Sequence, residues 1–192
     1  MGVETILTIL GFSIDILSCI FVLLTYSIFG KLRTFYSKLL MNYTTAVLLG
    51  DLFFLFGNLA YYYTQSTILC SVMAIVLHYL FLTRFVWTNL LSFNICKGFY
   101  NVSKMIIADP NERLWGRLAA YVVIGWAPSL LVLLITVAVN FAQPGTVGYG
   151  MNGRCWITEP IALGIAFILP AGLQMTTAPS SLSAVLTSTA CR

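Results

Sequence analysis

Four long apolar stretches constrain this chain more than any other feature of its sequence. About 20 consecutive apolar residues in a helix are needed to cross the hydrocarbon core of a bilayer. Ile6 to Phe29, Leu39 to Tyr62, Ile68 to Phe93 and Leu114 to Phe141 all reach that length. Of the 192 residues, 59% are apolar and 8% are charged, whereas soluble domains carry about 25% charged residues. The sequence therefore predicts a helical membrane protein.

A fifth apolar stretch is shorter than the other four. It covers Ile157 to Met175, and Glu159 and Pro160 interrupt its beginning. Its helical part would rise only about 24 Å at 1.5 Å per residue. We predict an all-α, polytopic membrane bundle in residues 1–175 and a Ser/Thr-rich tail in residues 176–192, disordered or a non-native end. The predicted helices cover approximately residues 6–29, 39–62, 68–96, 114–141 and 157–175.

The basic residues of the connections predict the orientation in the membrane. The first and third connections, with their helix ends, hold Lys31, Arg33, Lys38, Lys97, Lys104, Arg113 and Arg117, whereas the second has no charge and the fourth has only Arg154. Short loops rich in lysine and arginine stay in the cytoplasm. We therefore expect a multi-pass protein of the plasma membrane with its N-terminus outside. Its cytoplasmic face would contain Lys31, Arg33, Lys97, Lys104 and Arg113.

Two of the five cysteines fall on the predicted outer side. Cys70 begins the third apolar stretch, and Cys155 lies in the connection before the fifth. Disulfides persist on the oxidising side of a membrane. A bridge between these two cysteines is the favoured interpretation, and two free thiols are the alternative. The bridge would tie the last outer connection to the third helix.

Several motifs resemble those of secretin-like receptors, the class B and adhesion seven-helix G-protein-coupled receptors. The segment from Gly150 to Ile157, followed by a short span containing Pro170, is similar to their second extracellular loop and fifth helix. Trp87, Asn89, Ser92 and Phe93 resemble a third-helix signature of the Methuselah-like branch, with Asn94 in place of its aspartate. Gly125, Trp126 and Pro128 resemble the fourth-helix motif, one residue shorter. The first cytoplasmic loop and the start of the second helix also match, over Phe29 to Thr34 and Ser37 to Leu39.

The departures from this family pattern are informative too. Leu91 stands where class B hormone receptors have a glutamate, which favours the adhesion or Methuselah-like side. Tyr36 stands where a histidine is usual. The resemblance ends near Met175, so the chain looks truncated after the fifth helix of a seven-helix fold. A truncation, an alternative end and an imperfect gene model each explain the tail.

Polar residues inside apolar spans are the candidate functional residues, because charges in hydrocarbon are costly and face a bundle interior or water. Counting helical rise places Asp51 and Arg84 at a similar depth, and we predict an ion pair between them. Asp15 and Asn89 complete the candidate polar network, whose simplest role is structural. Asn58, His78 and Trp156 lie nearer the outer face and form a candidate ligand pocket, with a structural role as the alternative.

Trp87, Trp126, Pro128 and Pro170 are predicted to shape helix packing, the prolines by permitting kinks. We find no motif for catalysis or metal binding, so we expect neither an enzyme nor a cofactor.

The resemblance implies a receptor that couples an extracellular ligand or adhesion event to a heterotrimeric G protein. Membrane lipid is the expected solvent, a receptor oligomer is an expected partner, and nucleic acid is not. Two alternatives stay open: a small channel or transporter subunit, and a truncated receptor isoform that interacts with other receptors without signalling.

Overall fold

The computed structural model describes residues 3–102, 112–151 and 155–174 of the chain. Within these ranges the elements are α1 (Val3–Ile28), η1 (Gly30–Leu32), α2 (Phe35–Thr64), α3 (Thr67–Val102), α4 (Glu112–Ala142), α5 (Pro160–Leu163) and the π-helical stretch η3 (Gly164–Ile168). α5 and η3 belong to one apolar helix, Pro160–Gln174. The tail after Gln174 lies outside the described residues, as does Lys104.

Four of these helices are long and apolar enough to cross a membrane. The spans are Ile6–Ile28, Phe35–Thr64, Thr67–Ile95 and Leu118–Ala142, and Pro160–Gln174 is a shorter apolar helix. The predicted helical membrane bundle is thus confirmed. The fold departs from the expected boundaries mainly at α2, which begins at Phe35, and at α3, which continues to Val102.

Local chemistry explains where α2 begins and ends. The Thr34 side chain accepts a hydrogen bond from the backbone N–H of Ser37, which satisfies one of the free donors at the start of the helix. At the other end, Gln65 adopts a left-handed conformation with φ 49°, and its N–H bonds to the carbonyl of Tyr61. This closes the helix and leads directly into α3.

The fifth helix begins at Pro160, three residues after the expected Ile157. Proline suits the first turn of a helix because it has no N–H to leave unpaired. Ile157 instead forms an isolated antiparallel bridge with Tyr149. The expected start was wrong because Ile157 is buried by loop packing and not by helix packing.

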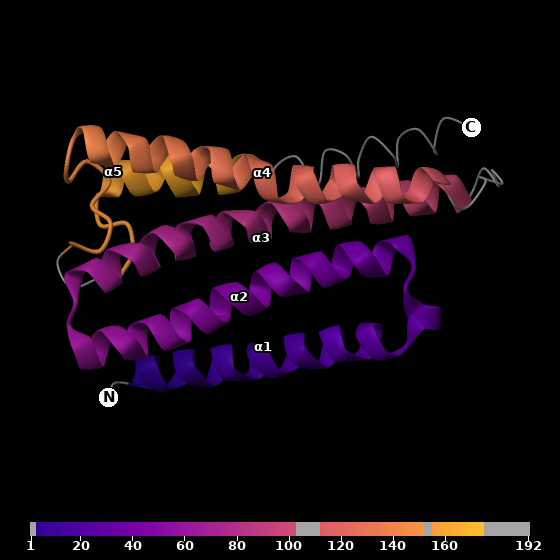
Figure 1. Cartoon of the computed structure of the whole chain (residues 1–192), viewed down its shortest axis with the longest axis horizontal. Helices are drawn as coiled ribbons and strands as arrows, with labels where there is room; N and C mark the ends of the chain where they lie inside the picture. The colour runs from indigo at the N-terminus through magenta and orange to yellow at the C-terminus, as the bar shows by residue number, and fades with distance from the viewer. Residues whose placement is uncertain (1–2, 103–111, 152–154, 175–192) are drawn as a thin grey trace.

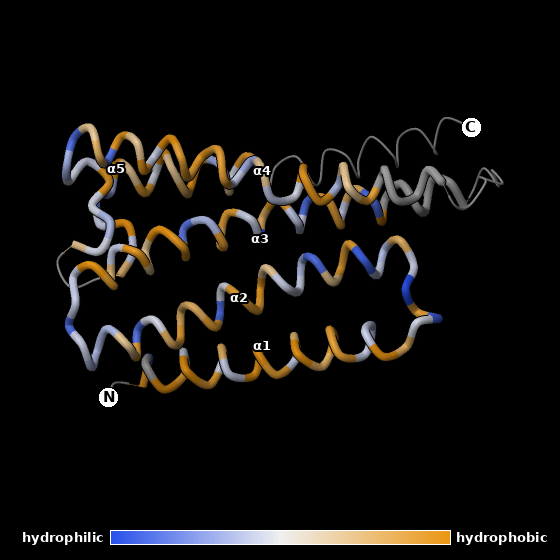
Figure 2. Tube along the Cα trace, viewed as in Figure 1, coloured by the Kyte–Doolittle hydropathy of each residue, from blue (hydrophilic) through white to orange (hydrophobic). Residues whose placement is uncertain are grey.

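The helices run side by side in the order α1, α2, α3, α4 (Figure 1). α1 packs against α2, and α3 packs against both α2 and α4. The fifth helix lies at the end of the bundle that contains Cys70 and Cys155, which we call the disulfide end. Figure 2 shows hydrophobic residues along most of α1 and α4 and hydrophilic residues at the turn between α1 and α2. This distribution matches helices whose outer faces contact lipid.

Trp87 is the centre of the packing between α2, α3 and α4. Its side chain is fully buried and forms a cluster with Leu39 and Ala46 of α2. The indole lies so close to Gly125 of α4 that a Cβ atom there would be 2.4 Å from two ring carbons. Trp126 meets Trp87 edge-on, with ring centroids 6.3 Å apart. The glycine-tryptophan pair of α4 therefore allows close helix approach. Pro128 lies inside α4, as predicted.

Candidate functional site

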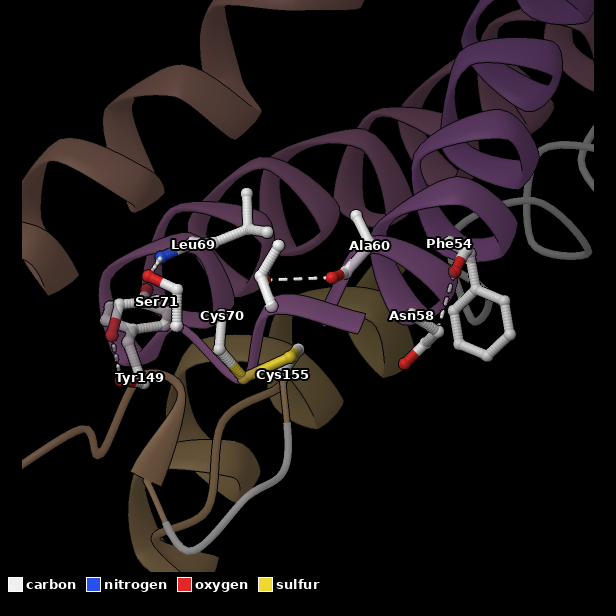
Figure 3. The surroundings of a disulfide bond; sticks show 10 residues. Phe54, Asn58, Ala60, Leu69, Cys70, Ser71, Tyr149 and Cys155 are labelled. Atoms are coloured by element: carbon white, nitrogen blue, oxygen red, sulfur yellow. Dashed lines mark hydrogen bonds between the residues drawn. A yellow bond between two sulfur atoms is a disulfide. The ribbon is translucent and has the colours of Figure 1, made fainter. Parts of the chain in front are cut away.

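A disulfide ties the loop between α4 and α5 to the start of α3. Cys70 and Cys155, 85 residues apart in sequence, are bonded through their sulfur atoms (Figure 3). Cys70 is fully buried. The predicted bridge is present, and it holds the α4–α5 loop (residues 143–159, with 152–154 outside the description) against α3.

The α4–α5 loop lies directly on the backbone of α3. The Ser71 hydroxyl donates to the carbonyl of Tyr149 at 3.0 Å (Figure 3). Gly150 has φ +68°, and a Cβ there would lie 2.6 Å from the backbone nitrogen of Ser71. Its N–H donates to the carbonyl of Trp156 at 3.2 Å, which folds the loop back on itself. Only glycine meets both the backbone angle and the close approach.

His78 joins this loop to α3 and the fifth helix. The ring is fully buried, with Nδ1 2.7 Å from the Tyr149 hydroxyl and Nε2 3.0 Å from the carbonyl oxygen of Ala166. A carbonyl only accepts, so Nε2 carries the hydrogen, and in a neutral ring Nδ1 accepts from Tyr149. Both ring nitrogens are satisfied. The Ala166 carbonyl belongs to η3, and such π-helical turns are frequent at functional sites.

Tyr149 links His78 further to α4. Its hydroxyl lies 2.9 Å from the Thr136 hydroxyl, and its side chain is buried among Ala74, Val147 and Ile157. Burial raises the pKa of Tyr149, although the hydrogen bond with Thr136 acts in the opposite direction. The phenol therefore stays protonated at neutral pH and available as a donor. We call Tyr149, His78, Thr136 and Ala166 the loop relay.

Trp156, beside the disulfide, packs between α3 and the fifth helix. Its ring meets Phe167 edge-on at 5.3 Å and Phe81 of α3 at 5.5 Å between centroids. Phe167 also contacts His78, with centroids 6.3 Å apart. Trp156 and His78 are therefore neighbours through one phenylalanine.

Asn58, the third predicted pocket residue, lies elsewhere. Its side chain is exposed on α2 and donates to the carbonyl of Phe54 one turn earlier, at 2.6 Å. Within the described ranges it makes no contact with His78 or Trp156. The ligand-binding role proposed for these three residues stays a prediction.

A cluster of three charges lies between α1, α2 and α3. Arg84 Nη2 is 2.8 Å from Asp51 Oδ1 and 3.6 Å from Asp15 Oδ2. Asp51 is fully buried, and its Oδ2 has no hydrogen-bond partner among the described residues. The guanidinium also lies over the Phe81 ring, 5.3 Å from its centroid. The predicted Asp51–Arg84 ion pair is present, and Asp15 joins it. Burying charges in hydrocarbon is expensive, about 2.5–3.5 kcal/mol each by insertion scales, so mutual pairing is required.

Asn89 does not join this charge cluster. It lies five residues beyond Arg84 on α3 and is half-buried, and it forms no hydrogen bond with Asp15, Asp51 or Arg84 in the part of the chain described here. In a helix, five residues turn the side chain by about 140°, which points Asn89 away from the cluster.

The family of the chain follows from comparison with known proteins. The model of the family described as 7 transmembrane receptor (Secretin family) matches residues 2–177. The chain belongs to the secretin family of seven-transmembrane receptors.

Curated members of this receptor group are similar over most of the chain. It is 31% identical over 175 residues to Adhesion G-protein coupled receptor G6 of Danio rerio, covering 86% of this chain and 14% of that protein. It is 27% identical over 172 residues to Adhesion G-protein coupled receptor G2 of Mus musculus, covering 85% and 16%. Cadherin EGF LAG seven-pass G-type receptor 1 of Homo sapiens is 25% identical over 181 residues, covering 93% and 6%.

The secretin-family assignment confirms the resemblance seen in the sequence. The relatives are adhesion receptors and not typical enzymes. The chain spans between 6% and 16% of their length. The finer assignment to the Methuselah-like branch stays a prediction.

Two contacts of the candidate site in this secretin-family chain were missed from the sequence. Neither Tyr149 nor Ala166 could be singled out from the sequence. Tyr149 reaches His78 only because of how the loop folds, and the group of Ala166 that bonds to His78 is a backbone carbonyl, which every residue has. Gly148 and Gly150, which flank Tyr149, were the available clue, since both have positive φ. Closely spaced glycines in a loop favour tight backbone packing.

At the end opposite the disulfide, the structure shows part of the predicted cytoplasmic face. Lys31 lies in η1 and is exposed. Arg33 uses its guanidinium to cap α1, donating to the carbonyls of Tyr26 and Ser27. This is a favourable place for a cation, because the C-terminal end of a helix carries partial negative charge. The side chains of Lys97 and Arg113 lie outside the description.

Proposed function

We propose that this chain forms part of the membrane region of an adhesion-type receptor that couples an outside stimulus to a heterotrimeric G protein. The observation that carries the proposal is the loop relay. A loop at the disulfide end contacts α3 covalently, and the same loop reaches the fifth helix through Tyr149 and His78. A stimulus that moves the loop would therefore reach two helices at once.

The relay would act through its two consecutive hydrogen bonds. Displacing Tyr149 removes the donor from His78 Nδ1, and a buried nitrogen without a partner is unfavourable. The ring would then reorient and release the Ala166 carbonyl at η3. The π-helical stretch η3 contains that carbonyl, and such turns are frequent at functional sites, so η3 is the element that would respond.

Two observations support a plasma-membrane orientation with the N-terminus outside. The disulfide belongs on an oxidising side. The two segments that it joins, the start of α3 and the α4–α5 loop, lie at the end of the bundle near the start of α1 (Figure 1). Lys31 and Arg33 lie at the opposite end, where the positive-inside rule places the cytoplasm. That end would offer part of the surface for a G protein.

The channel or transporter alternative is less well supported by this geometry. Asp15, Asp51 and Arg84 form one compact ion-paired cluster, with Asp51 fully buried, and do not follow one another along a path. His78 belongs to the separate loop relay.

A chimera tests the proposal. Residues 3–174 would replace the matching segment of the Danio rerio adhesion receptor, and G-protein dissociation would be measured by energy transfer in cells. We expect the chimera to signal, and we expect Tyr149→Phe in the chimera to weaken signalling severalfold at equal surface level. A chimera that reaches the surface and is silent would contradict the proposal, because the segment would then have lost the receptor function.

A further inference from the structure

An apolar groove runs between α2 and α3 toward the disulfide end of the bundle. Its volume is about 310 Å³, which is in the range of small-molecule sites in proteins. Figure 3 shows one lining residue from each helix, Ala60 of α2 and Leu69 of α3. We call it the α2–α3 groove, and its full lining is Leu52, Phe53, Phe56, Gly57, Ala60, Leu69 and Met73.

Gly57 and Met73 form the contact between the two helices at the base of this groove. Met73 lies directly on Gly57, since a Cβ there would overlap the Cε atom of the methionine. Met73 is buried, and its flexible thioether can adjust to a ligand that packs against it. Phe53 and Phe56 are 38% and 60% exposed, so their rings are available for contact with a ligand.

The α2–α3 groove faces away from the charge cluster and is short. Phe56 follows Asp51 by five residues, which turns its side chain by about 140°. α4 packs against α2 at the opposite end of the bundle, where Phe35 and Tyr121 meet edge-on at 5.4 Å between centroids. Every lining residue belongs to α2 or α3, and the lining rises only about 12 Å along α2. A membrane-spanning helix needs about 30 Å, so the groove suits a compact ligand.

A tyrosine supplies a polar group beyond the apolar lining. Tyr63 follows Phe56 by seven residues, so it lies on the same face of α2, about 10 Å nearer the disulfide end. It is the second-last residue of α2 and is 76% exposed, and its hydroxyl forms no hydrogen bond within the described ranges. Tyrosines at the ends of membrane spans sit at headgroup level. The groove therefore combines an apolar surface with one free hydroxyl at its mouth.

We propose that the α2–α3 groove binds a sterol, with its rings against Phe53 and Phe56 and its hydroxyl beside Tyr63. Inside a bilayer, burial of apolar surface gives no driving force, because lipid tails are as apolar as the groove. The preferred ligand is then the one that gains packing contacts and loses least conformational freedom. A rigid fused-ring molecule meets both conditions, whereas a flexible acyl chain must give up many rotamers. Occupancy of this site does not depend on coupling to a G protein.

A photoactivatable cholesterol analogue tests this proposal with the full chain in liposomes. Crosslinked positions are mapped by mass spectrometry, and we expect them within residues 52–73. Excess cholesterol should suppress this labelling severalfold, and its 3α-hydroxyl epimer should suppress it much less, because the epimer directs its hydroxyl differently relative to Tyr63. A phosphatidylcholine with a photoactivatable acyl chain is the second probe, and we expect it to label these residues severalfold less.

Paired substitutions separate groove binding from misfolding, and thermal unfolding checks that each variant keeps its fold. Ala60→Phe fills the groove and should lower sterol labelling severalfold, whereas Leu59→Phe, at a half-exposed position outside the lining, should leave it unchanged. Tyr63→Phe should remove the preference for cholesterol over its epimer, and Tyr62→Phe should keep it.

Three results would overturn the proposal. The first is equal sterol labelling of Ala60→Phe and Leu59→Phe. The second is persistence of the epimer preference in Tyr63→Phe. The third is equally strong labelling of residues 52–73 by the phosphatidylcholine probe, since the groove would then be a general site for acyl chains.

Discussion

Arg84 and Asp51 connect α3 to α2 through a contact of 2.8 Å, and the aspartate side of this pair has no exposure to solvent. Partners of a buried ion pair depend on each other, because removing one leaves an unpaired charge in a medium that cannot solvate it. Substituting these two residues therefore tests how much the ion pair contributes to holding α2 and α3 together.

We expect Arg84→Leu to destabilise the bundle by about 3–5 kcal/mol, the usual cost of breaking a buried pair from one side. Replacing both residues, as Arg84→Leu with Asp51→Asn, should recover a substantial part of this loss. Thermal unfolding of the detergent-solubilised protein measures both. An equal loss of thermal stability in the single and double variants would show that the Asp51–Arg84 ion pair does not stabilise the bundle.

Removing the disulfide should destabilise the α4–α5 loop strongly. The bond joins residues 85 positions apart, and the chain-entropy model assigns such a loop about 4–5 kcal/mol. Cys70→Ser and Cys155→Ser should each lower thermal stability, and the double variant should be no worse than either single one. If the losses of thermal stability in the two single variants added up in the double variant, the two cysteines would contribute independently and not through one bond.

The sequence predicted those features of the bundle that depend on length and depth. The length of the apolar stretches predicted the four long spans. Counting residues from the helix ends placed Asp51 and Arg84 at the same depth and so predicted their ion pair. Depth does not determine which way a side chain points. Asn58 was assigned to the pocket by its height, yet its neighbour Gly57 is the residue that meets Met73 of α3, so Asn58 faces away. The loop relay was missed because Tyr149 is positioned by tertiary packing and not by a periodic pattern.

Gly125→Ala should cost about 1–3 kcal/mol, the usual range for overpacking a well-filled core. The added Cβ would lie 2.4 Å from the ring of Trp87, which is fully buried and has no room to move. Gly50→Ala is the matched control, because its Cβ would lie 3.8 Å from Leu80, an ordinary contact. Alanine also favours a helix over glycine, so this control should be neutral or slightly stabilising. Thermal unfolding compares the two variants, and equal effects would contradict close packing at Trp87.

Tyr149→Phe keeps the ring in its buried cluster and removes only the hydroxyl. His78 Nδ1 then loses its partner at 2.7 Å, and Thr136 loses one at 2.9 Å. Leaving a buried polar group unpaired costs about 1–3 kcal/mol, so we expect a loss of stability in that range. Hydrogen exchange should also become faster in both the α4–α5 loop and η3, because His78 joins the two segments. Tyr62→Phe is the control, since Tyr62 is 74% exposed, and it should change neither quantity. Faster exchange in the loop alone would show that the relay does not reach the fifth helix.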